Sequence, residues 1–326
     1  MNFKNLIAKP LKILVDKLIS PFLAPIISFM ARTGFGTDNC LKWGCLPIPI
    51  HYYQPIPDIS DLERRNIWNM KKDLSWINFS PDMQLDLLLK LGQRFGLECV
   101  WPLNKTENPL QFYTENSAFS YGCAASLYSI IRNYKPKYII EIGSGNSSLV
   151  IHEALLANND GKKYVNSNYT IIDPYPGNIV KSHLNQYINL IEERLELVNI
   201  DIFKKLGKND ILFIDSSHIV RIGGDVNRLI LDIIPNLSPG VIIHFHDIPF
   251  PYEYPKIYST NPVFRMFWTE SYLLQAFLLF NKEFEIILAM NYLMQDHMDV
   301  FKKAFRNYDE TNMFGISGSF WIRRIE

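Results

Sequence analysis

Two glycines that follow an acidic residue at the end of an apolar run form the most informative pattern in this chain. The apolar run 138–140 leads to Glu141, and Gly143, Ser144 and Gly145 follow. Glycines at such a position let the backbone turn sharply and approach a ligand closely. The pattern predicts a nucleotide-cofactor site at the carboxyl end of a parallel strand, with a helix over 147–157 starting beside it.

Acidic residues also follow the next two apolar runs. The run 169–172 ends at Asp173, whose carboxylate can accept hydrogen bonds from both hydroxyls of a ribose. The run 195–198 is expected to be the third strand, and Asp201 follows it. The distance from Gly145 to Asp173 exceeds the roughly 20 residues usual in dinucleotide folds, and the Asn-rich insert 158–168 accounts for the excess.

The ends of the fourth and fifth apolar runs, 211–214 and 241–245, are dense in titratable side chains. Asp215 and His218 follow the first of these runs, and His246 and Asp247 follow the second. Neighbouring parallel strands would bring the four side chains into one crevice. Asp215 and Asp247 could bind a hard divalent cation such as Mg²⁺, or His218 or His246 could act as a general base oriented by an aspartate. A purely structural hydrogen-bonding role is the third interpretation.

The elements needed to position these residues follow an alternating strand and helix pattern, which predicts an α/β fold. Helices are expected over 81–95, 117–134, 224–234 and 269–280. Strands are expected over 138–140, 169–172, 195–198, 211–214, 241–245, 284–288 and 319–324.

A family resemblance rests on these motifs together. Glu141-x-Gly143-x-Gly145, with Ser148 where a dinucleotide fingerprint has its third glycine, resembles motif I of the class I S-adenosylmethionine-dependent methyltransferases. The segments 213–218, 246–255, 268–277 and 319–323 resemble a bacterial branch of that family which is largely uncharacterised.

The resemblance implies a doubly wound, Rossmann-like, seven-stranded sheet of order 3-2-1-4-5-7-6, whose last strand is antiparallel. It implies S-adenosylmethionine as cofactor and a Pro- and Tyr-rich loop, 248–255, over the acceptor pocket. His246 before Asp247 and Ile248 after it depart from the metal-dependent type. The implied cofactor-binding residues are Glu141, Gly143, Ser144, Gly145, Asp173, Asp201 and Asp215.

The expected activity is O-methylation or N-methylation of a small-molecule or glycan-like acceptor. By analogy, the pathway is polysaccharide or secondary-metabolite biosynthesis. Two other functions stay open. A degenerate methyltransferase fold could serve as a non-catalytic scaffold, and an NAD-dependent oxidoreductase would share the sheet and the first loop. Measured affinity for each cofactor separates these functions.

Composition limits the range of partners and compartments. The 326-residue chain has 33 basic and 33 acidic residues, so its global charge gives no indication of a nucleic-acid partner. The four cysteines have no metal-ligand or redox spacing, which favours four buried thiols in the reducing cytoplasm. The oligomeric state stays open.

The sequence predicts three regions. Residues 1–36 form a basic and apolar leader, residues 37–116 a Pro- and aromatic-rich wrapping segment with a helical extension, and residues 117–326 the cofactor-binding domain. The apolar stretch of the leader is shorter than the about 20 residues that span a bilayer, and Pro21 and Pro25 are expected to break it. Docking on the protein's own surface, peripheral contact with a membrane and a signal peptide are the three interpretations of this leader.

Overall fold

The structure, a computed structural model, divides the chain into two units, Met1–Ile67 and Trp68–Glu326. It describes residues 11, 13–162, 164, 167–262, 265–311 and 315–325. Residues 1–10 and 12 of the predicted leader therefore lie outside the described part. The larger unit joins residues 68–116 to the predicted cofactor-binding domain, and the three-region division stays a prediction.

The first unit consists of short helices. They are the π-helical turn Val15–Ile19, α2 (Ser20–Thr33), α3 (Thr37–Lys42) and α4 (Ile59–Arg64). The prediction that Pro21 and Pro25 break the apolar stretch was wrong, because α2 runs through both. Pro21 lies in the first turn, where its missing N–H is not needed, and Pro25 removes one hydrogen bond without ending the helix. Within the described residues, no helix has the length and apolar content needed to cross a membrane.

The second unit is built on a seven-stranded sheet of order β3-β2-β1-β4-β5-β7-β6. The strands are β1 (Tyr138–Ile142), β2 (Asn168–Ile172), β3 (Asn189–Ile191), β4 (Ile211–Ile214), β5 (Ile242–Phe245), β6 (Phe284–Ala289) and β7 (Phe320–Arg324). The first five strands are parallel, and β7 pairs antiparallel with both β5 and β6. The predicted fold class and strand order are confirmed.

The central strands form because their side chains are apolar on both faces of the sheet. All residues of β4 and β5 are buried, as expected for parallel strands covered by helices on both sides. In the register of the sheet, Ile142 of β1 lies beside Ile214 of β4, and Ile214 lies beside Phe245 of β5. The carboxyl ends of the three strands are therefore level, and the polar residues that follow them meet.

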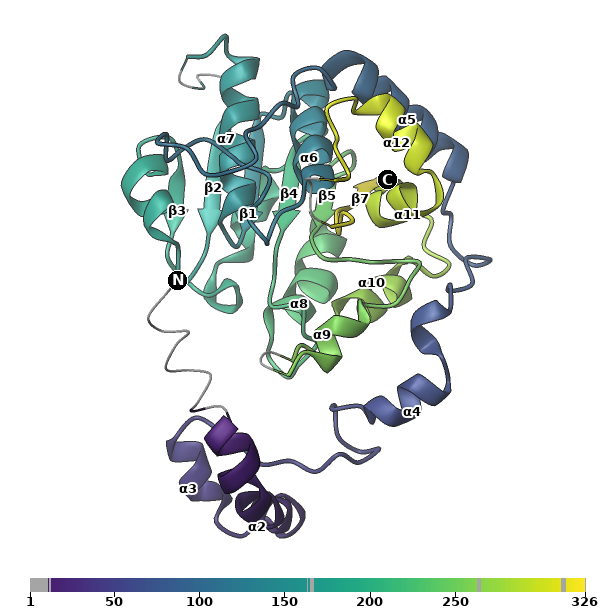
Figure 1. Cartoon of the computed structure of the whole chain (residues 1–326). Helices are drawn as coiled ribbons and strands as arrows, with labels where there is room; N and C mark the ends of the chain where they lie inside the picture. Colours follow the sequence, from purple (N-terminus) through teal and green to yellow (C-terminus); the bar gives the residue numbers. More distant parts are fainter. Residues whose placement is uncertain are drawn as a thin grey trace. The chain divides into compact units, whose positions relative to one another are not determined.

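Helices and short helical turns cover the sheet (Figure 1). The α-helices of this unit are α5 (Pro81–Phe95), α6 (Tyr121–Tyr134), α7 (Asn146–Asn158), α8 (Asp225–Asn227), α9 (Lys256–Thr260), α10 (Glu270–Leu278), α11 (Met290–Asp296) and α12 (Met298–Ala304). The π-helical and 3₁₀ segments are Ile67–Asn69, Val180–Leu184, Leu195–Leu197, Ile200–Lys205, Arg228–Ile233 and Ile234–Asn236. Helices α6 and α7 pack side by side, and α5 packs against α12 and β6.

Local signals explain where the two helices before β1 begin. Pro81 opens α5 as predicted, although Ser80 adopts a left-handed conformation and gives no side-chain cap. Helix α6 begins at Tyr121, later than the predicted residue 117, because the Ser120 hydroxyl accepts a hydrogen bond from the backbone N–H of Cys123. Ser120 thereby places the first turn of α6 beside the strand ends.

The predicted third strand was wrong. The strand is Asn189–Ile191, and the segment Leu195–Leu197 is a 3₁₀ turn. Leu195 and Val198 are buried in the hydrophobic core, so their apolar character serves packing. A period-two apolar pattern does not distinguish a strand from a 3₁₀ turn whose apolar side chains are buried.

Candidate functional site

The glycine loop after β1 is shaped by one steric constraint. Gly143 has φ +80°, and a Cβ atom there would lie 2.5 Å from the carbonyl oxygen of Asp215. Only glycine fits without moving the end of β4. Gly145 has extended backbone and open space around it, so neither strain nor crowding within the protein requires glycine there. The loop therefore fixes the distance between β1 and β4 at Gly143.

Glu141 holds the loop and does not line a described cavity. Its carboxylate is fully buried and accepts hydrogen bonds from the hydroxyls of Ser147 (2.6 Å), Ser148 (2.8 Å) and Tyr169. Burial raises the pKa of Glu141 to about 7, against the lowering effect of these hydrogen bonds. Its predicted contact with the cofactor stays a prediction, and the geometry gives it a role in positioning the loop and the start of α7.

A cavity of about 560 Å³ opens at the carboxyl ends of β1, β2 and β4. Its volume lies within the range of small-molecule and cofactor sites. Gly143, Asp173 and Asp215, all predicted from the sequence, line it together with Arg194 and Glu196. Arg194 and Glu196 form an ion pair of 2.7 Å on the wall of the cavity. Sequence reasoning missed this pair because it placed the third strand there.

Asp173 is presented to this cavity with acceptor capacity remaining. One carboxylate oxygen accepts a hydrogen bond from the backbone N–H of Tyr175 (2.7 Å), and the other accepts one from the Ser144 hydroxyl. A carboxylate has about four acceptor positions, so both oxygens retain capacity for ribose hydroxyls. Ser144 thus acts on Asp173, which couples the glycine loop to the end of β2.

Asp201 is not among the residues that line the cavity. It is on the 3₁₀ segment Ile200–Lys205, its side chain is 62% exposed, and it pairs with Lys204. Its predicted cofactor contact depended on a strand that the structure places elsewhere. A solvated surface ion pair accounts for its position.

The predicted grouping at the ends of β4 and β5 is confirmed as geometry. Nε2 of His218 lies 3.2 Å from Oδ1 of Asp215 and 3.9 Å from Oδ2 of Asp247. Nδ1 of His246 lies 3.5 Å from Oδ1 of Asp215 and 3.4 Å from Oδ2 of Asp247. His218 and Asp247 also have positive φ, 59° and 54°, and such conformations gather at functional sites. The catalytic roles of these four residues stay predictions.

His218 is enclosed by carboxylates and lines neither described cavity. Its Nδ1 lies 2.8 Å from Glu270, a buried residue at the start of α10 that sequence reasoning missed. Burial lowers the pKa of His218, but hydrogen bonds to Asp215 and Glu270 outweigh it and raise the pKa to about 10. Both ring nitrogens of His218 face carboxylates, so neither is free to take a proton from an acceptor, and this geometry favours a positioning role.

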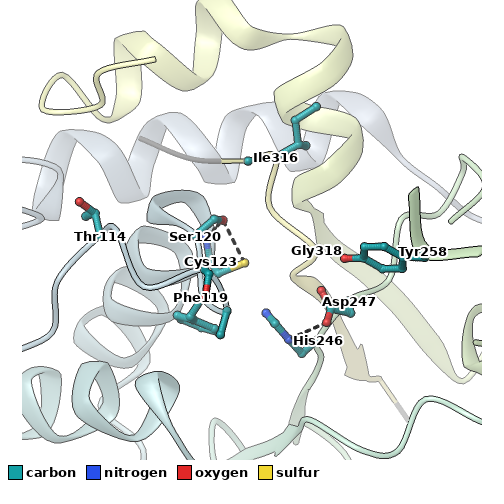
Figure 2. A pocket seen from close by; sticks show the side chains of 12 residues that line it. Thr114, Phe119, Ser120, Cys123, His246, Asp247, Tyr258, Ile316 and Gly318 are labelled. Atoms are coloured by element: carbon teal, nitrogen blue, oxygen red, sulfur yellow. Dashed lines mark hydrogen bonds and ion pairs between the residues drawn. The ribbon is translucent and has the colours of Figure 1, made fainter. Parts of the chain in front are cut away.

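A second, smaller cavity of about 130 Å³ lies on the other side of this group (Figure 2). It is enclosed by the segment before α6, the first turn of α6, the end of β5, helix α9 and the segment before β7. Its lining residues are Thr114, Ser117, Ala118, Phe119, Ser120, Cys123, His246, Asp247, Tyr258, Gly315, Ile316 and Gly318. The predicted aromatic loop 248–255 contributes none of these residues, and Phe119 and Tyr258 supply the aromatic faces.

His246 lines the second cavity and also contacts Asp215, which lines the first. It is 4% exposed, stacks on Phe119 at 5.0 Å, and has one ring nitrogen toward Asp247 and the other toward Cys123 (Figure 2). Burial lowers the pKa of His246, but the carboxylates of Asp247 and Asp215 raise it to well above its ordinary value of 6.5. These carboxylates therefore orient the ring and favour its charged form.

Cys123 was missed as a site residue because its spacing to other cysteines carries no signal. Burial raises the pKa of its thiol, but hydrogen bonding to His246 and the charge of that ring lower it to about 7. The prediction of four buried thiols was half wrong, since Cys45 is exposed and Cys40 partly so. Cys99 and Cys123 are buried.

The predicted metal ligands Asp215 and Asp247 do not fit a cation in this arrangement. The two imidazole rings contact the same carboxylate oxygens that a cation would use. Across the described part of the chain, no group of three or more His, Cys, Asp or Glu side chains is arranged to hold a metal ion. A dependence on Mg²⁺ stays a prediction that a chelator tests.

Comparison with known proteins now identifies the family. Residues 140–248 match a family model described as a methyltransferase domain. An uncharacterised protein of Archaeoglobus fulgidus is 31% identical over 170 residues, which cover 49% of this chain and 74% of the relative. This chain belongs to the class I S-adenosylmethionine-dependent methyltransferases. The methyltransferase thus has its glycine loop, Asp173 and Asp215 within the region that the family model matches.

Solved structures are also similar to the methyltransferase. One is the Podospora anserina methyltransferase PaMTH1 bound to S-adenosylhomocysteine, with 17% identity, a TM-score of 0.38, and coverage of 73% of this chain and 96% of that one. Another is the O-methyltransferase TomG from Streptomyces achromogenes in complex with S-adenosylmethionine, involved in tomaymycin synthesis. It has 11% identity, a TM-score of 0.38, and coverage of 82% and 96%.

Proposed function

We propose that this methyltransferase transfers a methyl group to a hydroxyl of one small ring, a single sugar unit, bound in the second cavity. The position of His246 carries the proposal. His246 lines the second cavity, and its Nδ1 lies 3.5 Å from Asp215, which lines the cofactor cavity. An acceptor hydroxyl beside this ring would therefore lie next to the cofactor.

Proton removal is the step that the protein's own side chains can supply. When bound, S-adenosylmethionine would supply a methyl group on a positively charged sulfur. As the new oxygen–carbon bond forms, the bond between sulfur and the methyl carbon would break and leave its electron pair on sulfur. Asp215 and Asp247 lie 3.5 and 3.4 Å from Nδ1 of His246 and favour a proton there, so the neutral ring would have its Nε2 lone pair, on the side of Cys123, to take the hydroxyl proton. Asp247, His246 and the acceptor hydroxyl would form one hydrogen-bonded line.

The size and lining of the second cavity support a polar ring as the acceptor. Its volume of about 130 Å³ is close to that of an engineered cavity of roughly 150 Å³ that accepts benzene, so a single six-membered ring fits. The Thr114 hydroxyl on its wall is buried and has no hydrogen-bond partner among the described residues. Ser117 and Ser120 add hydroxyls, and Phe119 and Tyr258 add aromatic faces, a combination suited to a sugar.

The direct test is a methyl-transfer assay with a panel of monosaccharides, nucleotide-activated sugars, catechols and amines. Product is detected by mass spectrometry as the gain of one methyl group. We expect methylation of at least one sugar hydroxyl, with the same rate in a chelator as in Mg²⁺. Methylation of catechols or amines alone would refute the acceptor class, and loss of activity in the chelator would revive a metal-assisted reaction.

Two nearby histidines, His244 in β5 and His246 directly after it, give a matched pair of variants. His246→Asn keeps a donor at the Nδ1 position and removes Nε2, so kcat should fall by about 10²- to 10⁴-fold with unchanged cofactor affinity. His244→Asn is the control, because His244 is buried against Ser319 and lines neither described cavity. Equal losses of kcat in both variants at unchanged cofactor affinity would remove His246 from the chemistry.

A further inference from the structure

The helical segment from residue 13 to residue 33 carries large apolar side chains that its own unit leaves uncovered. Leu18 is 61% exposed, Phe22 is 77% exposed and Phe29 is 55% exposed. Within the described part of Met1–Ile67, no residue is buried. This unit therefore has no hydrophobic core, and its apolar surface needs an apolar surrounding from elsewhere.

The apolar and polar side chains lie on opposite faces of the helix. At about 100° per residue, one face collects Leu18, Ile19, Phe22, Leu23, Ile26 and Phe29. The other face is polar or small at every fourth position, and it collects Asp16, Ser20, Ala24, Ser28 and Arg32, with Ile27 as an apolar exception. This two-faced pattern over residues 16–32 is typical of a helix that lies flat at an apolar boundary.

The charge and the aromatic residues of the same unit indicate which boundary it is. Residues 1–36 contain one acidic residue, Asp16, and five basic residues, which are Lys4, Lys9, Lys12, Lys17 and Arg32. Trp43, Tyr52 and Tyr53 are 89%, 80% and 78% exposed. Trp and Tyr favour the headgroup region of a bilayer, and clustered Lys and Arg favour anionic lipids.

We propose that the helical segment 13–33 lies on the surface of an anionic lipid membrane, with Phe22 and Ile26 on the buried side. A second copy of this chain is a poorer occupant, because it would bring the same excess of positive charge to the contact. This surface would hold the methyltransferase near acceptors that are attached to lipid.

The test is flotation of the full-length protein with vesicles of phosphatidylglycerol and phosphatidylcholine, and with phosphatidylcholine alone. We expect binding to the anionic vesicles that is weaker without phosphatidylglycerol and weaker in high salt. Phe22→Asp/Ile26→Asp should reduce binding by about tenfold or more relative to the matched control Ala24→Asp/Ser28→Asp. The two double variants carry the same charges at neighbouring positions on opposite faces, so their difference isolates the apolar face.

Affinity for S-adenosylhomocysteine, measured for each variant, shows that the larger unit remains folded. Failure of the wild-type chain to bind anionic vesicles would overturn the proposal, and so would equal binding by the two double variants. A wild-type dimer in light scattering that only Phe22→Asp/Ile26→Asp separates would assign the apolar face to a second copy. A lower melting temperature of that variant, without any vesicle binding, would assign it to the protein's own larger unit.

Discussion

Replacing Glu141 by glutamine should change how the stability of the methyltransferase depends on pH. Glu141 is fully buried beneath the glycine loop, where burial raises its pKa from 4.5 to about 7. Glutamine has nearly the same shape and can accept hydrogen bonds from Ser147 and Ser148 through its carbonyl oxygen. The variant thus removes the titration and keeps most of the packing.

The sign and size of the effect follow from the two pKa values. Between about pH 4.5 and pH 7 the folded protein holds a proton on Glu141 that the unfolded chain has released, so rising pH lowers the free energy of unfolding. A shift of about 2.5 units corresponds to roughly 3 kcal/mol of stability, present below pH 4.5 and lost as pH rises through 7. Glu141→Gln lacks this contribution.

The assay is urea denaturation of both proteins at several pH values from 5 to 8, because the difference between them cancels the other titrating groups. The wild type should lose stability relative to Glu141→Gln as pH rises. Glu98→Gln is a control whose difference from the wild type should stay nearly constant over this range: burial raises the pKa of Glu98, but hydrogen bonds to Arg132 and Tyr128 leave it below 4.5, so this group titrates at lower pH. A difference in the free energy of unfolding between wild type and Glu141→Gln that is constant with pH would refute the raised pKa of Glu141.

Three further predictions concern the site. Gly143→Ala should lower the free energy of unfolding by about 1–3 kcal/mol through its clash with Asp215, whereas Gly145→Ala should change it by less than about 0.5 kcal/mol, as urea denaturation would measure. His218→Gln should lower both turnover and the free energy of unfolding, because it leaves Glu270 buried without a charge partner. The double variant His218→Gln/Glu270→Gln should regain part of this stability. Strictly additive losses of stability from the two single changes would contradict the pairing. Methyl transfer should fall as pH is lowered through the raised pKa of His246. In Asp247→Asn, which lacks one of the charges that raise this pKa, the fall should occur at lower pH, and an unmoved profile would assign it to another group.

The strand ends were predictable where an apolar run is buried in the middle of the sheet. The strands β1, β4 and β5, after or within which Glu141, Asp215 and His246 lie, are mostly apolar and almost entirely buried, and such runs allow few alternatives. The third strand lies at the sheet edge and has only three residues, Asn189–Ile191. Its signal is weaker than that of the longer apolar run at Leu195, which was predicted to be the strand. The cofactor contact of Asp201, which depended on that run, stays a prediction.

Half of the residues that line the second cavity belong to no recognisable sequence motif. Thr114, Phe119 and Cys123 precede β1 in the chain and reach the site through the segment before α6 and its first turn. Glu270 pairs with His218 from a helix more than fifty residues away. Such contacts depend on tertiary packing, which a local pattern does not encode.

The most direct test of the cofactor site is calorimetric titration of S-adenosylhomocysteine into the wild type and two aspartate variants. Asp173 lines the cavity of about 560 Å³ with acceptor capacity remaining, whereas Asp201 is exposed and paired with Lys204. We expect micromolar binding by the wild type, a loss of about 1–3 kcal/mol in Asp173→Ala, and unchanged affinity in Asp201→Ala. No binding by the wild type would favour a non-catalytic scaffold, and equal losses in both variants would place the cofactor elsewhere.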